Sequence, residues 1–174
     1  MRNIPIEHIL KIKKSLPLIK SKIKVKIFFK AKKLFIDGEE LNEFVAEKII
    51  NSIDFGFDPE DALILLNPDF SLNFINIKEY TKKHNLKPVR SRVIGTDGRA
   101  KGTIEELTGS RIIINDNLLG IIADSENLTN TIQALISLIQ GAKHANVFSY
   151  LEKQNIILRK LNSDLGLKDE TNKL

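Results

Sequence analysis

The chain has 174 residues, 42% of them hydrophobic, and a net charge of +5, so it is long enough to bury a core in one or two domains. It contains no cysteine, which excludes disulfides, thiolate zinc sites and a thiol nucleophile. No apolar run approaches the roughly 18–20 residues of a membrane span, and charges interrupt the opening MRNIPIEHILKIKK, so we expect a cytoplasmic protein.

The first half of the chain predicts two strands followed by a helix. Residues 24–27 (KVKI) and 34–36 (LFI) are short segments rich in strand-forming residues, and Asp37–Gly38 is a typical tight turn. One apolar face then follows at helical spacing, formed by Leu41, Val45, Ile49 and Ile53.

A short helix and a domain boundary are predicted between the two halves, in FGFDPEDALILLN (55–67). Asp58 suits the capping position and Pro59 the first helical position, where its missing N–H costs nothing. Asn67–Pro68–Asp69 predicts a turn. We therefore expect one domain in residues 1–67, a second in 68–162, and a frayed polar tail in 163–174.

The second half begins with a predicted strand and two helices. The strand is FSLNFINI (70–77), with Leu72, Phe74 and either Ile75 or Ile77 on its buried face. The helical stretches YTKKHNLKPVRSRVI (80–94) and RAKGTIEELT (99–108) meet at Gly95–Gly98, and Gly109 ends the second. Two strands follow, separated by turn residues at 115–117.

Two further helices complete the second half. The apolar stripe of the first consists of Leu128, Ile132, Leu135, Ile136 and Ile139. Asp124 or Ser125 can cap its start, and Gly141 can end it in the left-handed conformation. The apolar side of the last helix, predicted over 143–161, consists of Val147 or Phe148, Leu151, Leu158 and Leu161.

The two halves align without a gap when each residue n is compared with residue n + 87. KVKI then falls on RIII (111–114), and LFIDGEELNEFVAEKI (34–49) falls on IIADSENLTNTIQALI (121–136). Each copy reads strand, strand, helix. The sequence therefore predicts a repeated fold.

The loop Gly95-Thr96-Asp97-Gly98 is the main functional signal. Without Cβ atoms, the two glycines let a phosphodiester backbone approach the main chain, and the second helix directs its free N–H groups and positive dipole end at the phosphates. The cations that flank the loop in sequence and can neutralise the same strand are Arg90, Arg92, Arg99 and Lys101.

An apolar floor for bases is expected beside this loop. Val93, Ile94 and Ile104 would form the floor, and the strand Arg111 to Ile114 would form the opposite wall. The backbone of this strand would read base edges, and its residues expected to contact bases are Arg111, Ile112 and Ile113. Only unpaired bases can be read in this way, so the pattern favours single-stranded RNA. The alternative is an ordinary turn in which Gly95 merely ends the first helix.

A nucleotide-binding P-loop does not fit this segment. It would need glycine at position 100, which is Ala100, and Ser or Thr after Lys101, where Gly102 stands. Glu105 and Glu106 are neighbours on a helix and are expected to be solvated. No Ser–His–Asp or paired-carboxylate arrangement emerges, so we expect no catalysis.

Metal binding would depend on His8, His84 and His144. These residues lie far apart in the sequence, with no second ligand at metal-binding spacing. We therefore expect neither a metal nor another cofactor.

A family resemblance adds to this interpretation. VRSRVIGTDGRAKGTIEELTGSRIII (89–114) with GAKHANVFSYLEK (141–153) resembles the second KH domain of the archaeal and eukaryotic KH-domain factor for small ribosomal subunit assembly, the partner of the Nob endonuclease. GFDPEDALILL (56–66) is similar to the stretch between that family's domains. The resemblance covers roughly residues 24–153.

The resemblance implies an α+β protein of two tandem type I KH-like domains, each a three-stranded sheet with helices packed on one face. It also implies no catalysis and binding of single-stranded RNA near the 3′ end of small-subunit rRNA. The implied protein partners are the maturation endonuclease and, in archaea, the alpha subunit of translation initiation factor two.

The sequence departs from this pattern at three places. No glycine precedes Gly38, so the first domain cannot hold a GxxG loop and is expected to be degenerate. Asp97 repels phosphate, at about 0.5–1 kcal/mol for an exposed charge. Gly102 weakens the second helix by about 1 kcal/mol relative to alanine.

We therefore expect the second domain to bind about four nucleotides of single-stranded RNA. Charge agrees, since residues 1–33 carry eleven Lys/Arg against Glu7 alone, and residues 81–111 carry eight basic against three acidic residues. The intervening residues 34–80 are acidic. The alternative function, favoured by Asp97, is a protein-interaction scaffold of KH fold with weak or no RNA binding.

Overall fold

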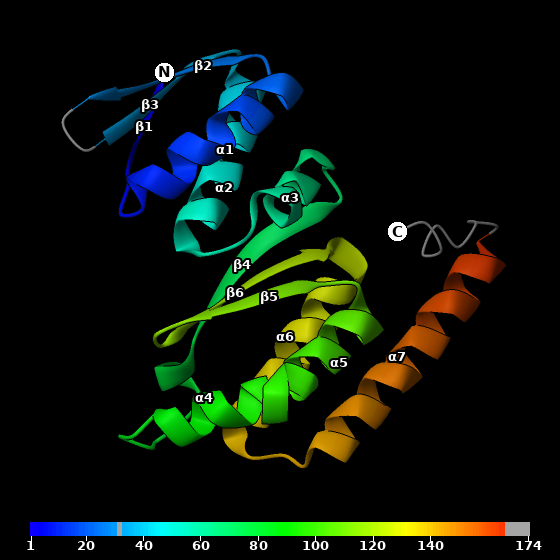
Figure 1. Ribbon diagram of the computed structural model, residues 1–174. Helices are drawn as coiled ribbons and strands as arrows, with labels where there is room; N and C mark the ends of the chain where they lie inside the picture. The colour runs from blue at the N-terminus through cyan, green and yellow to red at the C-terminus, as the bar shows by residue number, and fades with distance from the viewer. Residues whose placement is uncertain (31–32, 166–174) are drawn as a thin grey trace. The chain divides into compact units, whose positions relative to one another are not determined.

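The structure, a computed structural model, describes residues 1–30 and 33–165 (Figure 1). The chain divides into two compact units between Leu72 and Asn73, and each unit contains one three-stranded sheet. The predicted boundary, between residues 67 and 68, lies a few residues earlier, in the turn that precedes the strand Phe70–Asn76.

The first unit begins with a strand and a helix that were not predicted, followed by the predicted two strands and helix. Its elements are β1 (Arg2–Pro5), α1 (Ile9–Lys22), β2 (Val25–Lys30), β3 (Lys33–Gly38), α2 (Glu40–Phe55), α3 (Pro59–Ala62) and the 3-10 turn η1 (Leu63–Leu66). β3 is the central strand and pairs antiparallel with both β1 and β2.

One continuous helix, α1, connects β1 to β2. Ile12, Ser15 and Ile19 are its buried residues, and Lys20 and Lys22 in its last turn complement the helix dipole. The second unit has two helices and the glycine loop at the corresponding place. The first KH-like fold is therefore degenerate, as predicted, because an unbroken helix replaces that loop.

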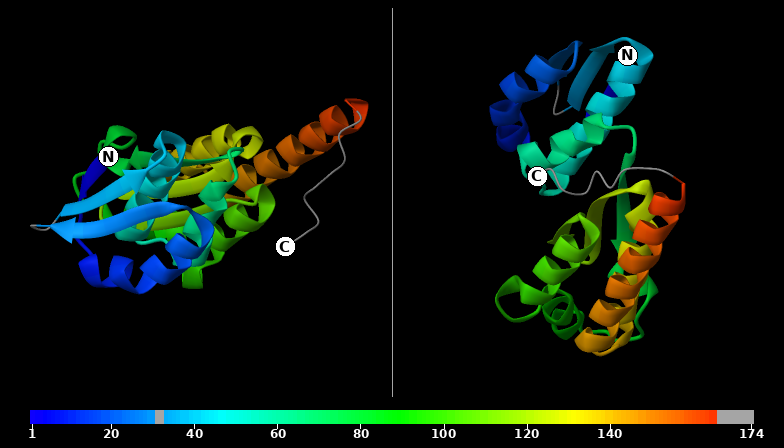
Figure 2. Two further views of the ribbon diagram at one scale, coloured as in Figure 1. Left: turned by 90° about the horizontal axis from the view of Figure 1, so that it is seen from above. Right: turned by 90° about the vertical axis from the view of Figure 1, so that its right-hand side faces the viewer.

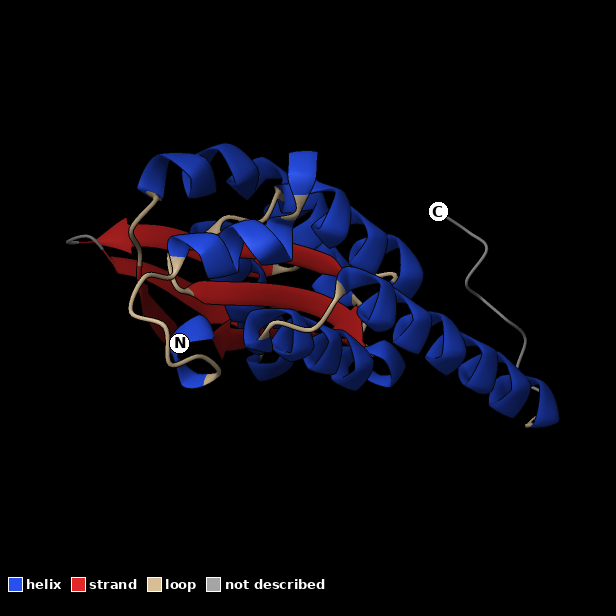
Figure 3. Cartoon of the chain, turned by 90° about the horizontal axis from the view of Figure 1, so that it is seen from below, coloured by secondary structure: helices blue, strands red, loops and turns tan. Residues whose placement is uncertain are grey.

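Helices α1 and α2 lie on one face of the first sheet, as the labels in Figure 1 show, and Figure 3 distinguishes the helices of the chain from its strands by colour. The buried side chains that the sheet and α2 contribute to this core are Ile4, Ile27, Leu34, Ile36, Ile49, Ile50 and Ile53. The predicted burial of Leu41 is wrong, since Leu41 is 68% exposed. Ala46 and Ile50 take the buried positions instead, which rotates the apolar face of α2.

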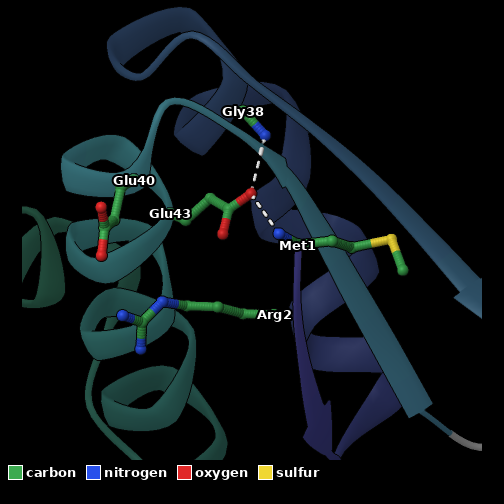
Figure 4. A pocket seen from close by; sticks show the side chains of 5 residues that line it. All are labelled: Met1, Arg2, Gly38, Glu40 and Glu43. Atoms are coloured by element: carbon green, nitrogen blue, oxygen red, sulfur yellow. Dashed lines mark hydrogen bonds and ion pairs between the residues drawn. The ribbon is translucent and has the colours of Figure 1, made fainter.

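Glu43 is a carboxylate on the buried side of α2. Its Oε1 accepts hydrogen bonds from the Gly38 N–H and from the Met1 ammonium, each at 3.0 Å (Figure 4). The Met1 ammonium lowers the pKa of Glu43 below its ordinary value; burial opposes this effect and the Gly38 N–H adds to it. The ionised carboxylate thus ties α2 to the ends of β1 and β3.

The second unit contains the elements β4 (Phe70–Asn76), the 3-10 turn η2 (Ile77–Glu79), α4 (Lys87–Ile94), the 3-10 turn η3 (Thr96–Gly98), α5 (Arg99–Thr108), β5 (Arg111–Asn115), β6 (Leu118–Asp124), α6 (Ser125–Gln140) and α7 (His144–Asp164). This order confirms the predicted one. β6 lies between β4 and β5 and pairs antiparallel with β5, so β5 is an edge strand.

Helices α4, α5 and α6 cover one face of this second sheet, and α7 packs against α5 and α6 (Figures 1 and 2). The fully buried side chains of this core include Ile77, Ile104, Ile112 and Leu119. Phe74, predicted on the buried face of β4, is 43% exposed, because Ile75 faces the core and strand side chains alternate. Ile77 is also buried, just after the strand.

Helix α4 is shorter than the helix predicted over residues 80–94, since it begins at Lys87. Pro88 lies in its first turn, and a proline lacks the N–H that a longer helix would need there. The side chains of Thr81 and Asn85 accept hydrogen bonds from the N–H groups of Lys83 and Lys87. These local turns replace the first predicted helical turns.

Helices α6 and α7 largely follow the predictions. Asp124 caps α6 by accepting a hydrogen bond from the Asn127 N–H at 2.7 Å, and Gly141 ends it with φ 104°. Val147 and Leu151 of α7 are buried, but Leu161, predicted on the same side, is 52% exposed.

The predicted tail, 163–174, begins inside α7, and its residues 166–174 lie outside the described part of the chain. No helix within residues 1–30 and 33–165 is both long enough and apolar enough to cross a membrane.

We expect Glu43→Gln to weaken folding at neutral pH but not in acid. Because the folded pKa is lowered, the ionised carboxylate stabilises the fold fully above its ordinary value of 4.5, and this contribution disappears as the pH falls from 4.5 through the folded pKa. The gap in melting temperature between the two proteins should therefore close below pH 4.5. Glu40→Gln, at an exposed position of the same helix, is the control; a gap that persists in strong acid contradicts the prediction.

Candidate nucleic-acid interface

The glycine loop between α4 and α5 has an unusual backbone. Gly95, Asp97 and Gly98 all have positive φ values, of 78°, 53° and 75°. Gly98 is left-handed and stands directly before the first residue of α5, Arg99. The chain therefore reverses within four residues, and Thr96 and Asp97 are exposed at the tip.

The N-terminus of α5 is open for an anion. No side chain caps it and its first turn contains no acidic residue, as far as the described residues extend. The first N–H groups of a helix have no partner inside the helix, and the helix dipole adds positive potential there. These are the features by which helix N-termini bind phosphate.

The two loop glycines differ in their surroundings. A Cβ on Gly95 would lie 2.6 Å from both the backbone nitrogen and the Cβ of Ala100, which is closer than real Cβ contacts come. A Cβ on Gly98 would meet nothing within 4 Å. Gly95 therefore permits the close approach of α5, whereas Gly98 leaves free space beside the open helix terminus.

Arg99 is the predicted phosphate contact that the structure leaves most available. Its side chain is exposed, and within the described residues its guanidinium makes no hydrogen bond or ion pair. It extends from the first position of α5, whose own N–H donates to the Thr96 carbonyl oxygen, at the helix terminus that no side chain caps. A phosphate bound at this terminus would lie within reach of its positive charge.

Arg92 was expected to neutralise phosphate, but its guanidinium is used inside the protein. Nη2 donates to the carbonyl oxygen of Gly141, at 3.0 Å, and to that of Ala142. In return His144 Nε2 donates to the Arg92 carbonyl oxygen at 2.9 Å. Arg92 therefore holds α4 to the connection between α6 and α7, a role that its position in sequence did not reveal.

Arg90 and Lys101 are also paired. Arg90 Nη1 donates to the backbone carbonyl of Asp116 at 3.1 Å and lies 3.8 Å from its carboxylate. Lys101 Nζ lies 2.9 Å from the carboxylate of Glu105, one helical turn further along α5. Arg90 thus contacts the turn between β5 and β6, and a phosphate has to compete with a carboxylate for each of these two cations.

Glu105 does not project into solvent as expected. Its Oε1 accepts a hydrogen bond from the Ile112 N–H at 2.7 Å while the carboxylate pairs with Lys101. Ile112 lies on the edge strand β5, so Glu105 joins α5 to the outer edge of the sheet. Sequence reasoning missed this contact because it joins two elements seven residues apart across a turn.

The expected apolar floor is only partly present. Val93, Ile104 and Ile112 are fully buried in the core, so their side chains cannot contact bases. Ile94, at the end of α4, is 37% exposed, and Arg111 and Ile113 on β5 are partly exposed. The surface available to bases therefore consists of Ile94 and the outer side of β5.

Nothing in the described part of the chain assembles a metal site, since no three His, Asp or Glu side chains come together there. The loop, the open helix terminus and the edge strand instead form a surface suited to a polyanion.

Comparison with known proteins adds independent evidence. Residues 71–156 match a family model described as the eukaryotic type KH-domain (KH-domain type I), the second KH domain of PNO1. A KH domain-containing protein of Methanocaldococcus jannaschii is 31% identical over 124 residues, which are 71% of this chain and 55% of that protein. The pre-rRNA-processing protein pno1 of Emericella nidulans is 31% identical over 111 residues, 62% of this chain and 43% of that protein.

The chain thus spans about half the length of the curated relatives it matches. Among solved structures, Dim2p of Pyrococcus horikoshii is 28% identical with a TM-score of 0.76, covering 87% of this chain and 98% of that chain. A chain of the a/eIF2alpha-aDim2p-rRNA complex of the same organism is 27% identical with a TM-score of 0.79, covering 90% of this chain and 94% of that chain. Together with the two KH-like folds and the glycine loop, these matches show that the chain belongs to the KH-domain family that includes the pre-rRNA-processing protein pno1 and archaeal Dim2p.

Proposed function

We propose that the chain binds single-stranded RNA through the glycine loop of its second KH domain, in the maturation of small-subunit rRNA near its 3′ end. The observation that carries this proposal is the open N-terminus of α5, with free space at Gly98 and the exposed guanidinium of Arg99 beside it. Single-stranded nucleic acid is the ligand because KH domains clamp about four nucleotides at such a loop.

Phosphates bind first at the helix terminus in this mechanism. The N–H groups of α5 and Arg99 hold the backbone, and Lys101 joins them when a phosphate competes with Glu105 for its ammonium group. The bases then lie toward Ile94 and the outer side of β5. Arg92 and His144 act by positioning α4 and do not contact the RNA.

The relatives support the process and the partners. The names of several describe pre-rRNA processing, and one structural neighbour is described in a complex with rRNA and a/eIF2alpha. We propose the same two partners for this chain. Association with the rRNA maturation endonuclease, absence of catalysis and a cytoplasmic location are further parts of the proposal, and they rest on the family resemblance.

A protein-interaction scaffold is the second candidate function. The internal pairing of Arg90, Arg92 and Lys101 favours it, because each of these groups is less available for phosphate than its sequence position suggests. The exposed carboxylate of Asp97 adds repulsion at the loop tip. RNA affinity and its salt dependence separate the two functions.

We expect Gly98→Asp to lower RNA affinity at least tenfold more than Gly98→Asn. Both side chains tolerate the left-handed conformation and have nearly the same shape, so the difference isolates the added charge beside the phosphates. Fluorescence anisotropy with an rRNA-like single strand measures it. Two or three phosphate contacts also predict a log–log salt slope of roughly −1.4 to −2.1 for the original protein. Equal affinities of both variants would show that the loop does not hold the phosphates, and a slope near zero favours the scaffold.

We expect Gly95→Ala to destabilise the second unit more than Gly98→Ala. At Gly98 the cost is the left-handed conformation alone, about 1–2 kcal/mol. At Gly95 the backbone, with φ 78° and ψ 176°, lies in a region that only glycine adopts readily, and an added Cβ would also collide with Ala100. Urea unfolding measures both variants, and equal losses of stability would show that α5 can shift away from Gly95 freely.

We expect Asp97→Asn to tighten RNA binding about two- to fivefold at low salt. The substitution removes an exposed charge worth about 0.5–1 kcal/mol while keeping a residue that accepts positive φ. The gain should fade at high salt because exposed charges are screened. Asp164→Asn, the same change at an exposed position near the end of α7, is the control; unchanged affinity for Asp97→Asn would place phosphate away from the loop tip.

A further inference from the structure

The first sheet has a face that its helices do not cover. Side chains alternate along a strand, and Ile4, Ile27, Leu34 and Ile36 point to the helix side, where they are buried. The opposite side, which we name the open face of the first sheet, carries Asn3, Pro5, Lys26, Phe28, Lys30, Lys33, Phe35 and Asp37. All of these residues are exposed or partly exposed.

Two stacked phenylalanines lie on this open face. Phe28 of β2 is directly opposite Phe35 of β3, and their rings are stacked with centroids 5.4 Å apart and an angle of 5° between their planes. Phe28 is 44% exposed. Because β2 is an edge strand, Phe35 covers one side of the Phe28 ring and no neighbouring strand of the sheet covers the other.

Two lysines lie beside this aromatic pair. Lys30 and Lys33 are directly opposite each other in the register, and each is two residues from one of the phenylalanines on the same face. Like charges at opposite positions of a strand pair destabilise the sheet. Within the described residues neither ammonium is ion-paired. The third lysine of this face, Lys26, differs because an acidic residue, Asp37, is its partner in the register. An anion between Lys30 and Lys33 would relieve their repulsion.

We propose that the open face of the first sheet is a second binding site for single-stranded nucleic acid, in the domain that lacks the glycine loop. A base extends the stack by lying on the free side of Phe28, and the adjoining phosphate lies between Lys30 and Lys33. Single strands are bound in this way because every unpaired base offers a flat face to an aromatic ring while cations follow the backbone. A protein partner fits less well, since lysines border the exposed phenylalanine instead of a continuous apolar surface.

Phe44 provides a matched comparison within the same unit. It is 42% exposed, on α2, so its exposure is almost that of Phe28. The Lys48 ammonium lies 4.3 Å from its ring centroid and the Arg2 guanidinium 5.4 Å. The protein's own cations thus lie over the ring of Phe44, and a base would have to compete with them for it.

Anisotropy with a labelled uridine decamer and the full chain tests the proposal, in both the original protein and the Gly98→Asp variant. We expect Phe28→Ala to weaken decamer binding at least fivefold in both forms, and Phe44→Ala to change it less than twofold. Lys30→Gln should weaken binding and flatten its salt dependence, because one phosphate contact is lost.

Phe28→Trp is the second measurement, and it does not depend on how well the alanine variant folds. The chain has no tryptophan, so the new indole is the only one present. We expect the decamer to quench its fluorescence, with the same midpoint as the anisotropy change measured for this variant.

The outcomes separate this inference from the proposed function. Unchanged affinity in Phe28→Ala together with unquenched Phe28→Trp overturns the second site and leaves the glycine loop untouched. If Phe28→Ala loses decamer binding while Gly98→Asp and Gly98→Asn bind with equal affinity, the second site is supported and RNA binding at the glycine loop is contradicted. Quenching of Phe28→Trp by a/eIF2alpha but not by the decamer shows a protein interface and overturns the inference.

Discussion

The close approach of Gly95 to Ala100 is the constraint on which the candidate site depends. Because Gly95 has no Cβ, α5 can begin close to the end of α4, and no side chain caps its N-terminus. A larger residue at position 95 would push the two helices apart. The second glycine, Gly98, contributes differently, since it supplies a left-handed turn and leaves open space in front of the helix terminus.

The polar contacts around the glycine loop hold it in place, but they engage cations that would otherwise be available to a phosphate. Arg92 and His144 tie α4 to the loop before α7, and Glu105 ties α5 to the edge of β5 while it pairs with Lys101. Such a loop is preorganised, so binding a ligand costs little ordering. The remaining attraction for an anion comes mainly from the helix terminus and Arg99, and Asp97 opposes it.

The two halves of the chain illustrate how one fold can carry two different surfaces. Both have an antiparallel β-hairpin followed by a long helix, in agreement with the repeat at n + 87. In the first half α1 is one continuous helix, so this half has no glycine loop and no helix N-terminus at the position of α5. The residues suited to a polyanion in this half lie instead on the open face of the first sheet, where Lys30 and Lys33 border the stacked Phe28 and Phe35.

The repeat, the order of the elements from residue 70 onward, the caps at Asp124 and Gly141 and the glycine loop could all be predicted from the sequence, because each depends on local backbone preference or on periodic burial. β1 and α1 were missed, and α4 was predicted too long across residues 80–86, where Thr81 and Asn85 form local turns before Pro88. The exposure of Leu41 and Phe74 and the pairing of Arg92, Lys101 and Glu105 followed only from tertiary structure. The physical reason is that periodicity identifies which residues share one side of an element, whereas the partner that each side chain meets depends on segments brought together by packing.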